Sequence, residues 1–140
     1  MCAPRIREPP HTRCAWGSYR DQAIDRQQAG RAAEARAVQV LQQAGFTLVA
    51  RNFRCRLGEI DIVARRAQLL VIAEVRLRSR QEFGGAAASI NPGKRRRIVR
   101  AARYLLRTQP ALARLAVRFD ALLLSAADGP IEWIEAAFEA

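Results

Sequence analysis

Two short apolar segments, close together in the chain, carry acidic side chains where buried strands are normally free of charge. The first is Gly58–Val63, which contains Glu59 and Asp61, and the second is Val71–Arg76, which contains Glu74. Carboxylates held close together raise one another's pKa unless a cation lies between them. Hard oxygen ligands suit Mg²⁺ or Mn²⁺. If the fold brings these acids together, we expect a divalent-metal site.

The connection between the two segments, residues 65–68, has the length of a hairpin loop. We therefore expect the segments to form antiparallel neighbouring strands. A turn centred between Arg66 and Ala67 would place Glu59 opposite Glu74. The position of the turn decides the register, and a shift of one residue would move the acids to opposite faces.

In this register Asp61 faces Ile72 and lies diagonal to Glu74. Because side chains alternate with a period of two, one face of the hairpin would carry four charged residues: Glu59, Asp61, Glu74 and Arg76. An ordinary exposed face, with Arg76 paired to an acid, is the alternative. The residues around Glu74 are apolar on both faces, however, and a lone carboxylate in a covered strand is costly to desolvate.

The remaining pattern predicts one domain over residues 21–140, preceded by a flexible basic tail, residues 1–20. The predicted elements are a helix of residues 21–44 that Gly30 could divide, strands 46–53, 57–64 and 68–77, a loop 79–90, a helix 92–107, and strands 117–124 and 131–135. Gly45 would end the first helix, Asn91 and Pro92 would start the second, and residues 128–130 would form a turn. This order predicts an α/β fold with a mixed sheet of four to five strands flanked by helices.

The net charge of the 140-residue chain is +11, carried almost entirely by arginine, since Lys94 is the single lysine. Residues 83–119 contain nine cations and no acid, whereas residues 120–140 contain five acids and no cation. This asymmetry predicts one surface that faces a polyanion, and nucleic acid is the commonest partner of that kind.

The helix of residues 92–107 is amphipathic, with a core-facing apolar stripe and a cationic face. The stripe consists of Ile98, Ala102, Leu105 and Leu106. The predicted nucleic-acid-binding residues are Lys94, Arg95, Arg96, Arg97, Arg100, Arg103 and Arg107. A solvated face without a ligand and a helix lying on a membrane surface are the alternatives. The apolar stripe is needed to cover the sheet, which argues against a membrane.

Three cysteines, Cys2, Cys14 and Cys55, form no CxxC pair, and their odd number does not suit a disulfide framework. We expect free thiols in a reducing compartment. His11 with Cys2 and Cys14 matches no zinc-site spacing. There is no apolar run of transmembrane length and no signal-peptide pattern before Asp21. Together these features predict a cytoplasmic protein.

Further residues place these acids in a recognisable pattern, which extends from Arg31 to Phe138. They are Ala33-Glu34, Gly45-Phe46, Arg51-Asn52-Phe53, Gly58-Glu59-Ile60-Asp61, Glu74-Val75-Arg76, Lys94 and Arg118-Phe119-Asp120. The pattern resembles the YraN-like family, a bacterial group of uncharacterised small proteins assigned to the restriction-endonuclease-like, or PD-(D/E)-x-K, superfamily. The resemblance implies a restriction-endonuclease-like core.

In that superfamily the strand acids bind one or two Mg²⁺ ions, and a lysine two residues after the second acid helps to position or activate water. The resemblance therefore implies Asp61 and Glu74 as metal ligands. Glu34 would be an outer acid that reaches the site from the first helix, and Glu59 a supporting acid. Arg76 stands at the position of the lysine.

Arg76 retains the positive charge, but its pKa above about 12 prevents it from acting as a general base at neutral pH. Lys94 could replace the lysine if the second helix begins near the carboxylates, although a lysine among arginines more often contacts phosphate. Two hypotheses follow. The first is a Mg²⁺- or Mn²⁺-dependent endonuclease that hydrolyses phosphodiesters in structured or single-stranded DNA, possible as a homodimer because cutting both strands needs two sites. The second is a catalytically impaired nucleic-acid-binding module.

Overall fold

The computed structural model describes residues 16–77, 90–125 and 129–140, with side chains from Gln28 onward. Its elements are α1 (Trp16–Gln43), β1 (Thr47–Cys55), β2 (Gly58–Arg66), β3 (Leu69–Leu77), α2 (Pro92–Thr108), α3 (Pro110–Ala113), β4 (Ala116–Leu124) and β5 (Ile131–Phe138). The predicted order of helices and strands is confirmed, with the short α3 as an addition. Pro110 opens α3 at a position where proline fits the first helical turn.

The five strands form one mixed sheet in the order β1-β2-β3-β4-β5. Strands β1, β2 and β3 form an antiparallel meander, β4 runs parallel to β3, and β5 pairs antiparallel with β4. A parallel pair needs a crossover connection, and α2 lies in the connection between β3 and β4. The predicted mixed α/β sheet flanked by helices is confirmed.

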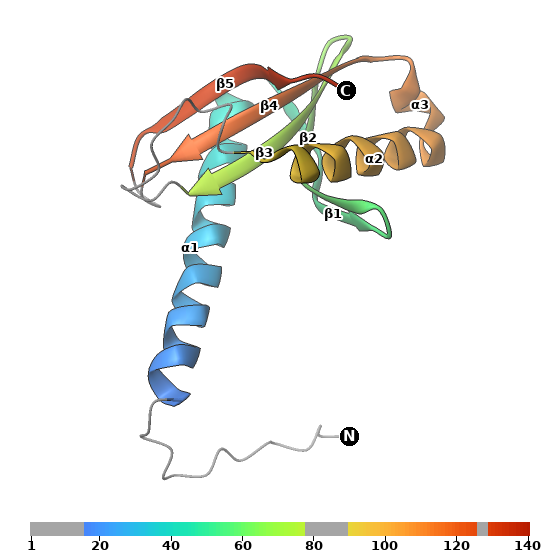
Figure 1. Cartoon of the computed structure of the whole chain (residues 1–140). Coiled ribbons are helices and arrows are strands. Elements are labelled where there is room, and N and C mark those ends of the chain that lie inside the picture. Colours follow the sequence, from blue (N-terminus) through green and yellow to red (C-terminus); the bar gives the residue numbers. More distant parts are fainter. Residues whose placement is uncertain (1–15, 78–89, 126–128) are drawn as a thin grey trace, which may run out of the picture.

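The two long helices cover opposite faces of the sheet (Figure 1). On one face, apolar residues of α1 pack with alternate residues of β2 and β3, including Ala37, Leu41 and Val71. On the other face, α2 packs through a buried stripe of Ile98, Val99, Ala101, Ala102 and Leu105. The sheet is therefore buried on both sides at its centre, as the apolar sequence of β3 predicts.

Helix α1 differs from its predicted bounds. It begins at Trp16, so it includes the last five residues of the predicted tail, and it continues through Gly30 without a break. The rest of that tail, residues 1–15, with Cys2, His11 and Cys14, lies outside the described residues. Gly45 follows the helix with φ of 92°, the left-handed conformation expected there.

Predictions at the second helix and the chain end can also be compared. Asn91 caps α2 by accepting a hydrogen bond from the backbone N of Lys94 at 2.8 Å, as predicted. The predicted loop, except Ile90, and Asp128 of the predicted turn lie outside the described residues. Strand β5 is longer than predicted. Within the described part of the chain, no helix has the length and apolar character needed to cross a membrane.

Candidate active site

The β2–β3 hairpin has a different register from the predicted one. Arg66 pairs with Leu69, so the turn is centred between Ala67 and Gln68, and Ala67 adopts φ of 51°. The register is shifted by two residues: Val63, not Asp61, faces Ile72. A shift of two keeps side chains on the same face, so the prediction that Asp61 and Glu74 approach each other survives the error.

Asp61 lies where the ladder between β2 and β3 ends. The last paired residues of the ladder are Ile62 and Ala73, and beyond them the Asp61 carboxylate accepts a hydrogen bond from the backbone N of Val75 at 2.9 Å. The strand is also irregular here, because Ile60 packs in the α2 layer whereas Ile62 packs in the α1 layer. A regular strand would place both on one face. Asp61 therefore occupies a fork in the sheet that both helices can approach.

Glu74 is the second acid of this fork, with only 4 % of its side chain exposed. The Lys94 ammonium forms an ion pair with its Oε1. Lys94 can reach Glu74 because the Asn91 cap fixes the first turn of α2, which lies beside the end of the hairpin. The structure thus places Lys94 beside the carboxylates, which is the condition under which it could serve as the missing lysine.

The environment of Asp61 favours its protonated form. Its pKa is raised from 3.8 to about 7, first by burial and then by the nearby charge of Glu74, with which it also shares a hydrogen bond. The bond from Val75 and the charge of Lys94 oppose the shift. A carboxyl group whose pKa is raised by burial and by a neighbouring acid is typical of functional sites, although structural networks also produce such shifts.

Glu34 approaches the same site from α1. Its side chain is 19 % exposed, lies 3.9 Å from the Arg51 guanidinium and is hydrogen-bonded to Asn52. Burial and the charge of Asp61 raise its pKa, whereas Asn52 and Arg51 lower it. Asn52 has φ of 51°, a conformation that asparagine tolerates. Glu34 is thus electrostatically coupled to Asp61 and held by β1.

Glu59 and Arg76 are the other two residues predicted on this face. Glu59 is largely exposed and pairs with Arg54 of β1 at 3.5 Å, so the predicted contact between Glu59 and Glu74 is wrong. Arg76 lies partly buried on β3, opposite Leu123 of β4. Of the four residues predicted on one face, the structure brings Asp61 and Glu74 together.

The predicted nucleic-acid-binding residues of α2 divide into two groups. Five arginines are exposed: Arg96, Arg97, Arg100, Arg103 and Arg107. Lys94 contacts Glu74 as described, and Arg95 packs inward, where its Nε donates to the Ile90 carbonyl at 2.9 Å and its guanidinium lies 5.7 Å from the Phe138 ring centre. The exposed set gives α2 a cationic outer face beside the acid pair.

The donor set can be compared with the needs of a divalent metal. Among the described side chains, no group of three or more His, Cys, Asp or Glu residues is arranged to hold a metal ion. Mg²⁺ commonly binds through one or two carboxylates together with water and substrate phosphate. The hydrogen-bonded Asp61 and Glu74 fit that requirement, whereas Zn²⁺ would need further protein ligands.

Asp120 is a buried acid whose role the sequence did not disclose. It is fully buried and accepts two hydrogen bonds from Arg118, at 2.8 and 2.9 Å, and one each from Trp133 and the backbone N of Ala136. The spacing Arg118-x-Asp120 on one strand was the available indication, since residues two apart share a face.

These features define a mixed α/β protein in which a forked β-hairpin holds an acid pair beside the start of a cationic helix. The model of the uncharacterised protein family UPF0102 matches residues 33–124. The chain belongs to this family, which confirms the resemblance to the YraN-like group.

Individual relatives span most of both chains. A UPF0102 protein of Dechloromonas aromatica is 51 % identical over 112 residues, which cover 79 % of this chain and 88 % of the relative. One from Methylobacillus flagellatus is 46 % identical over 114 residues, covering 81 % and 98 %. One from Xanthomonas campestris is 48 % identical over 113 residues, covering 81 % and 93 %.

Proposed function

We propose that this protein is a metal-dependent nuclease with a restriction-endonuclease-like core, which hydrolyses phosphodiester bonds in DNA. The observation that carries the proposal is the contact set of Asp61, Glu74 and Lys94: two carboxyl groups that share a hydrogen bond, with an ammonium on one of them. The element order and the position of both acids on β2 and β3 agree with the resemblance to that superfamily.

Asp61 and Glu74 would hold Mg²⁺ or Mn²⁺. A divalent ion there would supply a Lewis acid for the phosphoryl oxygen and lower the pKa of bound water. The carboxylates can bind the ion only when Asp61 has lost its proton, so activity should increase as the pH rises through about 7. Glu34, coupled to Asp61, would assist from the α1 side.

Lys94 would take the role of the superfamily lysine, which helps to position or activate water. Its ammonium lies at the acid pair, is partly exposed and can turn toward a phosphate that enters the site. A lysine can donate or accept a proton in ways that arginine cannot. Arg76, on the next alternate position of β3, would contact the phosphate as a fixed charge.

The cationic outer face of α2 supplies a docking surface for the DNA backbone. Its five exposed arginines would neutralise phosphates and make binding strongly salt-dependent. A metal-free protein that binds DNA without cutting it is the second candidate, and it is favoured by one observation. The Lys94 ammonium forms an ion pair with Glu74, so a cation of the chain itself can balance one carboxylate of the pair.

The test is cleavage of duplex, single-stranded, flap and junction DNAs with Mg²⁺ or Mn²⁺. We expect wild-type cleavage that disappears in Asp61→Asn and Glu74→Gln. The matched control is Glu135→Gln, which removes an exposed acid with an arginine partner elsewhere. If the wild type binds these DNAs but cuts none, the non-catalytic candidate replaces the nuclease.

A further inference from the structure

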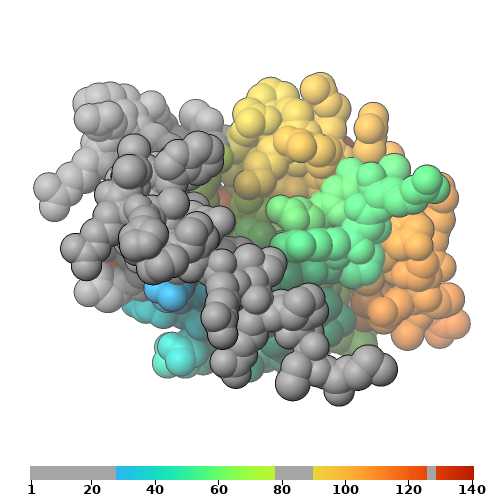
Figure 2. Space-filling view, turned by 90° about the horizontal axis from the view of Figure 1, so that it is seen from below, coloured from blue at the N-terminus to red at the C-terminus, as the bar shows by residue number. Residues whose placement is uncertain are grey.

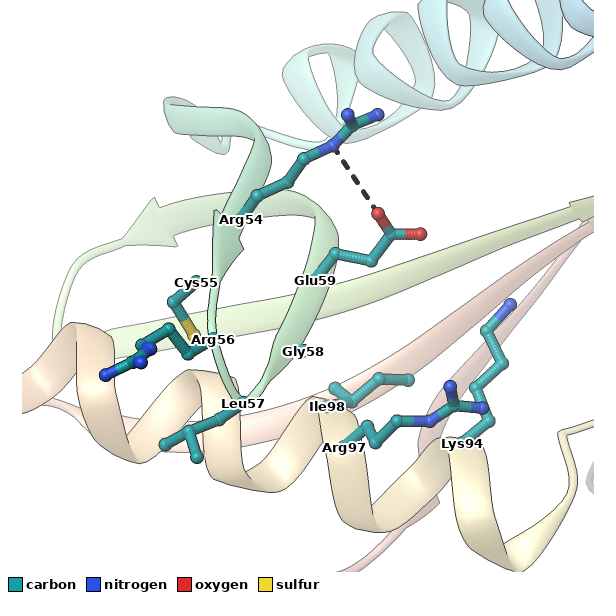
Figure 3. A pocket seen from close by; sticks show the side chains of 9 residues that line it. All are labelled: Arg54, Cys55, Arg56, Leu57, Gly58, Glu59, Lys94, Arg97 and Ile98. Carbon is teal, nitrogen blue, oxygen red and sulfur yellow. Dashed lines mark ion pairs between the residues drawn. The ribbon is translucent and has the colours of Figure 1, made fainter.

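A pocket of about 530 Å³ lies between the β1–β2 hairpin and the first two turns of α2 (Figure 3). Figure 2 shows the hairpin and the start of α2 as neighbouring lobes on one face of the molecule. The volume lies within the range of about 300–1,000 Å³ that is usual for small-molecule sites. Lys94 lines the pocket and also contacts Glu74, so the pocket adjoins the acid pair.

The hairpin and the helix are in direct contact at the base of the pocket. A Cβ atom on Gly58 would lie 2.5 Å from the carbonyl oxygen of Arg97, closer than atoms can approach. Only glycine therefore lets the hairpin rest on the α2 backbone at this point. This contact fixes the two walls relative to each other, so the pocket is part of the packed structure.

The lining of the pocket combines cations with apolar surface. The cations are Arg54, Arg56, Lys94 and Arg97, and the single acid is Glu59, which is paired with Arg54. Leu57, 45 % exposed at the end of the hairpin, and Ile98 supply the apolar part. Figure 3 shows Lys94 and Arg97 extending from the helix, across the pocket from Arg54 and Glu59.

This combination matches the chemistry of an unstacked nucleotide. A duplex backbone presents phosphates to a flat cationic face and keeps its bases inside the stack. A single strand exposes base faces as well, and proteins bind it with cationic grooves and with aromatic side chains or arginine planes on which bases stack. A base held outside the stack in a pocket can also lie against apolar side chains. An exposed leucine surrounded by arginines next to a nucleotide-sized hollow suits the second case.

We propose that this pocket holds one unpaired nucleotide next to the acid pair, with its phosphate on Arg97 and Lys94 and its base against Leu57. The inference rests on the proposed function for the identity of the polymer and names its substrate class. That class is single-stranded DNA or the unpaired stretch of a branched DNA. Intact duplex would reach the outer arginines of α2 without filling the pocket.

The experiment measures binding of the full chain to fluorescent DNA by polarisation, in the presence of a chelator so that no metal-dependent cleavage occurs. The probes are one oligonucleotide as a single strand and the same sequence as a duplex. The pocket variants are Arg97→Gln and Leu57→Ser, both at exposed side chains. Their controls are Arg103→Gln, an exposed arginine of α2 outside this pocket, and Val117→Ser, an apolar residue 37 % exposed on β4.

We expect the wild type to prefer the single strand by about tenfold or more. Leu57→Ser should weaken single-strand binding about fivefold or more and duplex binding less than twofold. Arg97→Gln should also weaken single-strand binding about fivefold or more, but duplex binding only by the smaller factor expected for Arg103→Gln, because Arg97 also belongs to the exposed arginines of α2. Arg103→Gln should weaken both probes by a similar factor, and Val117→Ser neither. Equal wild-type affinity for both probes, or equal losses on both probes in Leu57→Ser, would overturn the inference.

The outcome separates this inference from the proposed nuclease. If the protein shows the expected binding pattern but never cleaves DNA, the nucleotide pocket is supported and the nuclease proposal is refuted. If the protein cleaves duplex DNA in a manner that requires Asp61 but shows no preference for single strands, the nuclease proposal is supported and the nucleotide pocket is refuted.

Discussion

Acids that are largely removed from solvent lie on three neighbouring strands. Asp120 stands alone on β4, whereas Asp61 on β2 and Glu74 on β3 form a pair. In the parallel register of β3 and β4, Ala73 pairs with Asp120, and Glu74 pairs with Ala121. Asp120 therefore points to the α1 side, and Glu74 to the side covered by α2. Asp120 receives four hydrogen bonds, two of them from one arginine, whereas Asp61 and Glu74 face each other.

The hydrogen bonds of Asp120 hold neighbouring strands of the fold together, whereas Asp61 and Glu74 are the acids that we propose as metal ligands. The donors around Asp120 satisfy its charge within the fold, so little capacity remains for a ligand. The contacts of Asp61 and Glu74 include one backbone donor and one lysine, and burial together with the charge of Glu74 raises the pKa of Asp61 to about 7. Burial alone therefore does not identify a candidate metal site. The number of hydrogen-bond donors relative to the number of acids distinguishes Asp120 from the pair of Asp61 and Glu74.

The largest effect on stability should come from replacement of Asp120. Asp120→Ala should lower the free energy of unfolding by about 3–5 kcal/mol, because it leaves the Arg118 guanidinium and the Trp133 N–H without their acceptor. Urea denaturation measures this loss. The matched control is Glu135→Ala, which removes the exposed partner of the same arginine and should cost less than about 1 kcal/mol. Equal losses in the two variants would contradict the contrast.

Replacement of Lys94 tests its proposed role beside Asp61 and Glu74. Lys94→Gln should reduce the cleavage rate about 10²-fold, because the acid pair loses its cation. It should also raise the pKa of Asp61 above about 7, since the charge of Lys94 now opposes that shift. Single-turnover kinetics and NMR titration measure the two effects. A variant with unchanged kcat would show that Lys94 only contacts the DNA backbone.

The raised pKa of Asp61 has a consequence for stability. An unfolded aspartate releases its proton near pH 4, whereas the folded protein holds it until about pH 7, so the wild type loses stability as the pH rises through this window. Asp61→Asn keeps an acceptor for the Val75 N–H and removes this penalty.

At pH 8 we expect Asp61→Asn to be more stable than the wild type by about 2 kcal/mol, roughly half of what three pKa units represent, because the site is partly open to water. The gain should shrink by pH 5. Thermal unfolding at both pH values measures it, and a variant that is less stable than the wild type at pH 8 would refute the raised pKa of Asp61, which comes first from burial and then from the charge of Glu74.

The smallest effect concerns the pocket rim. Glu59→Gln removes the one acid that lines the pocket and releases Arg54, so single-stranded DNA should bind about twofold more tightly at low salt. Polarisation with increasing salt measures the change, which should disappear at high ionic strength. Weaker binding by this variant would show that Glu59 orients the ligand.

The sequence was sufficient for the order of elements, the Asn91 cap and the approach of Asp61 to Glu74. The hairpin register was misplaced by two residues because Ala67 adopts positive φ, a conformation that sequence patterns assign to glycine or asparagine. The predicted approach of Asp61 to Glu74 is still correct, because a register shift of an even number of residues keeps each side chain on the same face of the strand.

Long-range placement could not be predicted in the same way. Lys94 reaches Glu74 because a helix in the crossover between β3 and β4 docks beside the hairpin, and helical periodicity does not specify where a helix docks. Only the resemblance placed Glu34 near the site, and its contacts with Arg51 and Asn52 of β1 depend on how α1 docks on the sheet. Tertiary packing decided both.

Electron paramagnetic resonance can follow Mn²⁺ binding to the full chain and so determine whether Asp61 and Glu74 hold a divalent metal. We predict that wild-type protein and Glu135→Gln bind Mn²⁺ at pH 8, that Asp61→Asn does not, and that wild-type binding weakens below pH 6 as Asp61 takes up its proton. Absence of wild-type binding at pH 8, or undiminished binding in Asp61→Asn, would show that Asp61 and Glu74 are not metal ligands.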